Sequence, residues 1–143
     1  LSRQLSDCLL SFEKVWEEKN IDISVELEDR VIVTENFAFL DIIWHNLLSN
    51  AFKFTDNGGV VSLTQTSDDE FITVKIKDTG CGIDEETKAH IFDKFYQGDT
   101  SHAEEGNGLG LALVQKIAER NNYEISVESE INKGTEFTVK IKK

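Results

Sequence analysis

The stretch Glu105-Gly106-Asn107-Gly108-Leu109-Gly110-Leu111 places three glycines at alternate positions, directly before a helical pattern that runs from Leu111 to Arg120. Because glycine has no Cβ, alternate glycines let a backbone come close to a bulky ligand and turn sharply into a following helix. The amides at the start of such a helix suit an anion, for example a phosphate. A plain loop would show the same pattern, so the interpretation depends on the residues upstream.

Length and charge limit the class of protein. The chain has 143 residues, which suffice for one domain with a core and are too few for two, so we expect a single domain over 1–143. The net charge of −12 opposes binding to nucleic acid or to an anionic membrane surface, and neither is an expected partner. Cys8 and Cys81 lack metal-ligand spacing, so no zinc site is predicted. No apolar run is long enough to span a membrane, and the missing initiator Met suggests a piece of a larger protein.

Helical periodicity appears in four places. Apolar residues at three- and four-residue spacing predict an amphipathic helix over residues 1–19. A longer pattern from Glu35 to Phe54 has one apolar stripe. The stripe comprises Phe37, Leu40, Trp44, Leu47, Leu48, Ala51 and Phe54. Shorter helices are predicted over Glu85–Phe92 and Leu111–Arg120, and the aperiodic segment Gln97–Gly108 between them is predicted to be a mobile loop.

Strict alternation of apolar and polar residues predicts the strands. Their ranges are Ile21–Leu27, Val60–Thr66, Phe71–Lys77, Tyr123–Ser129 and Thr135–Lys142, with Val31–Val33 as a further short candidate. Turn residues separate the hairpin-like pairs. Hairpins interspersed with helices predict an α/β (α+β) two-layer sandwich, in which a mixed, mostly antiparallel sheet carries the helices on one face.

Polar residues on the long helix are candidate phosphate ligands. Asn46, Asn50 and Lys53 stand at i, i+4 and i+7, and therefore point to the same side. The carboxamide oxygen of Asn50 suits a hard cation such as Mg²⁺, which takes only one or two ligands from protein. Lys53 offers a compact positive charge to a phosphate. An ordinary solvated surface is the alternative interpretation.

Asp78 closes a predicted strand directly before Gly80 and Gly82. Its carboxylate can accept a hydrogen bond from an exocyclic amino group such as that of adenine, while the glycines let the backbone pass beneath the base. A turn-forming Asp would look the same in the sequence.

Taken together and in order, five segments closely resemble the N, first glycine, F, second glycine and final glycine boxes of the ATP-binding domain of bacterial sensor histidine kinases. The segments are His45–Thr55, Asp78–Gly82, Phe92–Tyr96, Gly106–Leu111 and Lys133–Phe137. The resemblance spans nearly the whole chain, and a joint match in order is far more specific than any single box. It implies the Bergerat ATP-binding fold, which gyrase, mismatch-repair and heat-shock ATPases share.

The resemblance also implies roles for single residues. Asn50 would be the Mg²⁺ ligand, Lys53 and Lys94 would act near the phosphates of ATP as the other catalytic residues, and Asp78 would bind the adenine amino group. The further nucleotide contacts that the family implies are Asn46, Gly80, Gly82, Ile83, Phe95, Tyr96, Gly106, Gly108, Leu109, Gly110, Leu111 and Thr135. Residues 97–110 would form a lid over the triphosphate.

One position separates kinases from hydrolases within this resemblance. The related ATPases carry a Glu, which activates water, four residues before the Mg²⁺-binding Asn; here that position is Asn46, which cannot act as a general base near neutral pH. The resemblance therefore implies slow hydrolysis and transfer of the γ-phosphoryl group to a nucleophile from elsewhere. His45, His90 and His102 do not match the family's phosphoacceptor motif, whose Thr-Pro is impossible in a chain without Pro.

We therefore expect the acceptor histidine on a dimerisation and phosphoacceptor domain of the same parent protein, with a response regulator downstream. The isolated domain is expected to be monomeric and cytoplasmic, either free or as the cytoplasmic part of a membrane-bound sensor. Two alternatives stay open: a serine/threonine protein kinase of the anti-sigma type with the same fold, and a degenerate nucleotide-binding interaction module.

Overall fold

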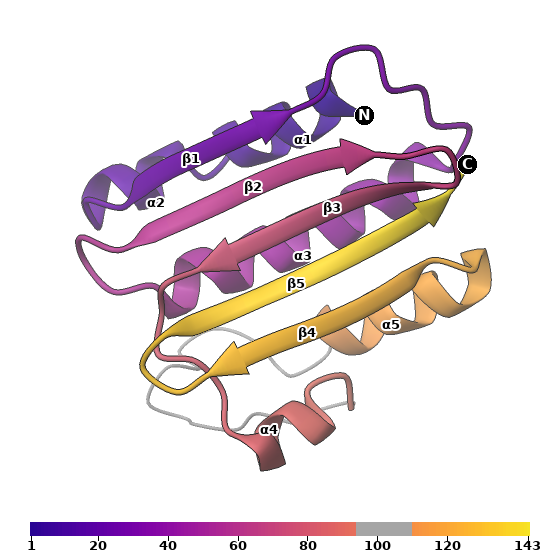
Figure 1. Cartoon of the computed structure of the whole chain (residues 1–143). Coiled ribbons are helices and arrows are strands. Elements are labelled where there is room, and N and C mark those ends of the chain that lie inside the picture. Colours follow the sequence, from indigo (N-terminus) through magenta and orange to yellow (C-terminus); the bar gives the residue numbers. More distant parts are fainter. Residues whose placement is uncertain (94–109) are drawn as a thin grey trace.

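Five strands form one mixed sheet in the computed structural model, which describes residues 1–93 and 110–143. The strands are β1 (Asp22–Leu27), β2 (Val60–Ser67), β3 (Phe71–Asp78), β4 (Glu124–Glu130) and β5 (Gly134–Lys142). Their order across the sheet is β1-β2-β3-β5-β4 (Figure 1). β1 pairs with β2 in parallel, and the other three pairs are antiparallel, which confirms the predicted mixed, mostly antiparallel sheet.

Apolar and polar side chains alternate along the strands and therefore lie on opposite faces of the sheet. In β3 the side chains of Ile72, Val74 and Ile76 are buried, whereas those of Lys75 and Lys77 between them are exposed. One face therefore carries the apolar core, and the other carries polar side chains toward water.

Helices cover the apolar face, as predicted. They are α1 (Ser2–Leu10), α2 (Glu13–Glu18), α3 (Phe37–Phe54), α4 (Glu85–His90) and α5 (Gly110–Asn121). In Figure 1, α1, α3 and α5 lie behind the sheet, and α4 lies beyond the end of the sheet toward which β3 runs. The long α3 is the centre of the core: Ile43, Trp44, Leu47 and Leu48 on it are completely buried. Among the described residues, no helix has both the length and the apolar character that a membrane span requires.

The single helix predicted over residues 1–19 is wrong, because the structure has two helices with a break at Ser11 and Phe12. The Ser11 hydroxyl donates to the Cys8 carbonyl oxygen at 2.5 Å, and this side-chain bond competes with the helical backbone. The break directs the Phe12 ring onto Phe52, with 5.3 Å between the ring centroids. The apolar spacing, which runs on through the break, gives no sign of it.

The short strand predicted at Val31–Val33 is also wrong, since this segment has no regular secondary structure. Val31 and Val33 pack against the core as the chain crosses the end of the sheet, and Ile32 points outward with 84% of its surface exposed. The next helix begins at Phe37 rather than Glu35, because the side chain of Asn36 caps it. Phe37 was expected in the buried stripe, yet 66% of its surface is exposed in the first turn.

Candidate functional site

The predicted phosphate ligands lie on one segment of α3. Asn46, Asn50 and Lys53 are half-buried, at the positions where a helical repeat places them on a common side. The Asn46 amide donates to the carbonyl oxygen of Ile42 at 2.7 Å, which fixes its orientation along the helix. The Lys53 ammonium lies 5.5 Å from the centroid of the Phe54 ring. The segment thus carries amide groups and one cation at its C-terminal end.

Gly110 brings the start of α5 against this segment. A Cβ placed on Gly110 would lie 2.6 Å from Asn46 Oδ1, so a larger residue there would have to displace the Asn46 side chain. Leu111, the next residue, packs against the core. The structure therefore joins the last glycine of the glycine-rich stretch to the predicted asparagine face, although 64 positions separate Asn46 from Gly110 (110 − 46).

Asp78 ends β3 as a buried carboxylate. Only 4% of its surface is exposed, and Oδ1 accepts a hydrogen bond from the Gly80 amide at 2.8 Å. Burial raises the pKa of Asp78 from 3.8 to about 6, although hydrogen bonds from the backbone of Gly80 and Thr135 act in the opposite direction. A carboxylate kept in such a place suits a ligand that donates a hydrogen bond, because that bond would offset part of the lost hydration.

Gly80 connects the Asp78 end of the sheet to the end of α3. A Cβ on Gly80 would collide with the carbonyl oxygen of Phe54, one residue after Lys53. The Asp78 end of β3 and the C-terminal end of α3 are therefore neighbours in the structure. Thr135 lies at the same place, because it is the cross-strand partner of Asp78 in the pairing of β3 with β5.

Ser129 is a candidate site residue that the sequence interpretation missed. Its hydroxyl accepts from the Ile83 amide at 2.8 Å, donates to the Gly134 carbonyl oxygen at 2.9 Å, and lies 2.9 Å from the hydroxyl of Thr135. Ser129 thus ties the connection after β3 to the β4–β5 hairpin and sets the position of two predicted base contacts. Only the Ser-Thr pairing across the hairpin could have indicated it, since Ile83 is 46 positions away.

Part of the predicted site lies outside the described residues. These predictions concern Lys94, Phe95, Tyr96, Gly106, Gly108 and Leu109, together with residues 97–109 of the lid that was expected over residues 97–110. Their roles stay predictions.

The described part of the site fits a nucleotide. At one end a buried carboxylate can accept from an amino group, and at the other a carboxamide and an ammonium group can bind anionic or cation-bound oxygens. Between them, the Gly80 backbone packs so closely against the Phe54 carbonyl that no Cβ would fit, and this packing holds the two ends side by side. Within residues 1–93 and 110–143, no group of three or more His, Cys, Asp or Glu side chains could hold a metal ion by itself.

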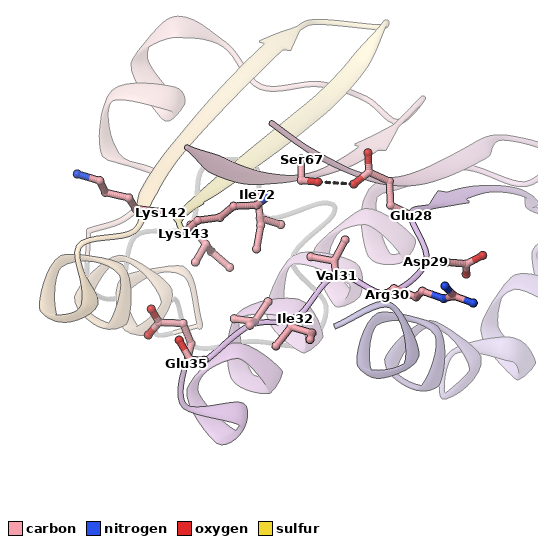
Figure 2. A pocket seen from close by; sticks show the side chains of 13 residues that line it. Glu28, Asp29, Arg30, Val31, Ile32, Glu35, Ser67, Ile72, Lys142 and Lys143 are labelled. Carbon is pink, nitrogen blue, oxygen red and sulfur yellow. Dashed lines mark hydrogen bonds between the residues drawn. The ribbon is translucent and has the colours of Figure 1, made fainter. Parts of the chain in front are cut away.

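A cavity of about 710 Å³ lies elsewhere, at the opposite end of the sheet from Asp78. It is lined by the connection from β1 to α3 and by the ends of β3 and β5, as Figure 2 shows for Val31, Ile72 and Lys143. A hydrogen bond of 2.6 Å from Ser67 to Glu28 closes one side. Its described lining contains none of the predicted site residues, so this cavity is separate from the candidate nucleotide site.

Comparison with known proteins connects this arrangement to one family. The family described as histidine kinase-, DNA gyrase B-, and HSP90-like ATPase matches residues 35–143. The chain is 40% identical, over 126 residues, to the heme sensor protein HssS of Staphylococcus saprophyticus, covering 88% of this chain and 27% of HssS. It is 34% identical, over 144 residues, to the sensor histidine kinase RppB of Synechocystis, covering 99% of this chain and 32% of RppB. The chain thus spans about a third or less of the length of these relatives.

Solved structures share the whole fold. The nucleotide-free catalytic domain of histidine kinase ThkA superposes with a TM-score of 0.87 at 27% identity, covering 100% of this chain and 92% of that domain. Full-length ShkA, solved in complex with AMPPNP, gives 0.83 at 29% identity, covering 96% of this chain and 28% of ShkA. ThkA has also been solved in complex with the response regulator protein TrrA; that match has a TM-score of 0.82 at 25% identity and covers 100% of this chain and 40% of ThkA.

Proposed function

This chain belongs to the histidine kinase-, DNA gyrase B- and HSP90-like ATPase family, and we propose that it binds Mg²⁺·ATP and donates the γ-phosphoryl group to a histidine on a separate domain. Within the family it is an ATPase domain of the sensor histidine kinase type, and its relatives include sensor kinases. The proposal concerns the bound metal, the residues that hold the nucleotide, and the acceptor of the phosphoryl group.

The adenine end of the proposed site is Asp78. A carboxylate with 4% of its surface exposed can accept a further hydrogen bond beside those from the backbone, and the exocyclic amino group of adenine is a suitable donor. Gly80 and Gly82 bring backbone close to the base, and Ile83 and Thr135, both held by Ser129, border it. Selectivity for adenine over guanine is expected, because guanine has a carbonyl oxygen where adenine has its amino group, and this oxygen would repel the carboxylate.

The phosphate end is α3. Asn50 is the proposed Mg²⁺ ligand, with the remaining ligands coming from phosphate oxygens and water, as is usual for Mg²⁺ in nucleotide sites. A bound Mg²⁺ would neutralise charge on the phosphates during transfer. Lys53 is the proposed cation beside the same phosphates, and the amides of Gly110 and Leu111 at the start of α5 are proposed anion contacts. Lys94 is proposed as a further phosphate contact from its place in the family motif.

Transfer is favoured over hydrolysis by the chemistry of Asn46. Its amide nitrogen donates to the carbonyl oxygen of Ile42, its oxygen lies beside Gly110, and a carboxamide offers no base to activate water. The proposed acceptor is therefore a histidine on a dimerisation and phosphoacceptor domain of the same parent protein, and the nucleophile arrives with that domain.

The downstream partner is proposed to be a response regulator. The support is the complex of ThkA with the response regulator protein TrrA, in which the kinase shares the fold of this chain. A cytoplasmic location and a monomeric isolated domain belong to the same proposal. The parent protein's stimulus is a matter for its other domains.

The observation that carries the proposal is the buried Asp78 carboxylate beside the polar face of α3. Calorimetric titration of the 143-residue chain with ATP should give one site per chain, with higher affinity when Mg²⁺ is present. Asp78→Asn should lower the affinity for ATP at least about tenfold, because its amide would face the adenine amino group with a second donor. Asp69→Asn, in the exposed turn between β2 and β3 at the other end of β3 from Asp78, is the matched control. Equal affinity of Asp78→Asn and the unchanged chain would contradict the assignment of the adenine end.

A further inference from the structure

Lys19, at the C-terminal end of α2, binds the C-terminus of α3. Its ammonium donates to the carbonyl oxygens of Phe52 at 2.9 Å, Lys53 at 3.4 Å and Thr55 at 3.1 Å. The last carbonyls of a helix have no partner within the helix and form the negative end of its dipole. An ammonium group has three N–H donors, so one side chain satisfies three of these carbonyls together.

The fourth carbonyl in this run, that of Phe54, faces the other side. It is the atom that leaves no room for a Cβ on Gly80, two residues after Asp78. The end of α3 is therefore held between Lys19 and the backbone that follows β3. The main chain of Lys19 is also fixed, because its carbonyl oxygen accepts from the Gly58 amide at 3.0 Å.

This contact lies next to the proposed site without being part of it. Asn50 and Lys53, the proposed metal and phosphate ligands, occupy the last turns of α3, and Asp78 is the proposed adenine ligand. The position of the α3 C-terminus sets the separation of these two ends. A ligand that binds at both ends needs this separation, whereas a ligand that binds at the adenine end alone does not.

We infer that Lys19 is a positioning residue, which holds the phosphate end of the site at the distance from Asp78 that ATP requires. The inference rests on the proposed function. Lys19 is not one of the proposed nucleotide ligands and would act through the last turn of α3, whose carbonyls it binds. Loss of its ammonium group would leave three carbonyls to find other partners and would let the last turn loosen.

The test compares two ligands of different length on the full 143-residue chain. In Lys19→Met, the affinity for Mg²⁺·ATP should fall about tenfold, while that for adenosine should change less than about twofold, both followed by NMR titration. Lys19→Arg keeps a cation with several donors, so its ratio of Mg²⁺·ATP affinity to adenosine affinity should stay close to that of the unchanged chain. Amide hydrogen exchange should become faster over residues 52–55 in Lys19→Met.

Two control variants separate positioning from general destabilisation. Gln4→Met breaks the hydrogen bonds that join α1 to the other end of α3, at the Phe37 carbonyl and the Trp44 indole, and should lower the melting temperature without changing the affinity ratio. Lys14→Met removes an exposed lysine from α2 and should change neither quantity. If Lys19→Met does not fold, Lys19→Gln is the milder variant, with an expected fall in the ratio of about threefold.

The outcomes distinguish this inference from the proposed function. A normal affinity ratio in Lys19→Met or Lys19→Gln, with a lower melting temperature, would show a purely structural role and overturn the inference alone. Failure of the unchanged chain to bind Mg²⁺·ATP would overturn the proposed function, and the inference with it.

Discussion

The carboxylate of Asp78 is held at the expense of folding stability. Its pKa in the folded protein, about 6, is higher than the usual 3.8, because burial disfavours the charged form. The folded state therefore binds this proton more tightly than the unfolded state does. The resulting stabilisation is complete below pH 3.8 and is lost as the pH rises through about 6. At neutral pH the buried Asp78 carboxylate is therefore mostly ionised. Such a charge is unfavourable in a hydrophobic core, but it can accept a hydrogen bond from a ligand.

Replacement of this carboxylate should stabilise the ligand-free protein. The difference between 3.8 and about 6 corresponds to about 3 kcal/mol, of which Asp78→Asn should recover about 1 to 2 kcal/mol at pH 7.5, since its buried amide needs new partners. The advantage should shrink as the pH falls from 7.5 to 5, where the wild-type carboxyl group becomes protonated. Urea denaturation of both proteins across this range measures it. A difference that does not change with pH would contradict the raised pKa.

At the scale of elements, α3 combines two functions along one length. Its N-terminal half is anchored in the core by Trp44 and by the cap at Asn36, and its C-terminal half carries the proposed ligands. Asn50 lies 14 residues after Asn36 (50 − 36), which is about 21 Å along a helix. Substitution of the cap residue should therefore lower the free energy of unfolding without changing the affinity for the nucleotide.

Asn36→Ala tests this separation. The Asn36 side chain accepts from the amides of Ala38 at 2.9 Å and Phe39 at 3.2 Å, and its loss should lower the free energy of unfolding by about 1 kcal/mol. Asn36→Asp keeps the acceptor oxygen, and Asn and Asp are about equally good N-cap residues. Its free energy of unfolding should therefore differ from that of the unchanged chain by only about a few tenths of a kcal/mol. Urea denaturation gives the stability, and titration with Mg²⁺·ATP should give an unchanged affinity. A large loss of affinity in Asn36→Ala would show that the two halves of α3 are coupled.

The elements themselves were largely predictable, because alternation and helical spacing report which side of a segment is buried. The predicted strand Phe71–Lys77, for example, differs from β3 by a single residue. The errors occur where a tertiary contact, rather than the local pattern, determines the local structure. Ser11 breaks a helix whose apolar spacing continues, and Val31–Val33 has strand-like residues but crosses the end of the sheet to reach α3.

For the whole molecule, the order of the motifs predicted the family and the fold, and the structure adds how distant segments meet. Gly110 against Asn46, Ser129 beneath Ile83, and Lys19 at the end of α3 are contacts between positions 33 or more apart. Local pattern carries no information on such contacts, because each residue type there is also common in turns and on surfaces. The resemblance supplied roles for Asn50 and Asp78, but neither Ser129 nor Lys19.

The whole chain is proposed to be a phosphoryl donor that does not carry the acceptor histidine. The chain would therefore act only when the domain with the acceptor histidine is supplied. This also separates the proposal from a serine/threonine kinase with the same fold, since phosphohistidine is labile in acid and phosphoserine is stable. An interaction module without transfer activity would label nothing.

The most direct measurement is incubation of the 143-residue chain with Mg²⁺ and γ-³²P-labelled ATP, with and without the phosphoacceptor domain of its parent protein, followed by acid treatment. We predict that label appears on the acceptor domain, is lost in acid, and disappears when Asn50→Ala replaces the unchanged chain. The chain alone should stay unlabelled. Acid-stable label on the acceptor, label on a histidine of the isolated chain such as His102, or no transfer at all would contradict the account.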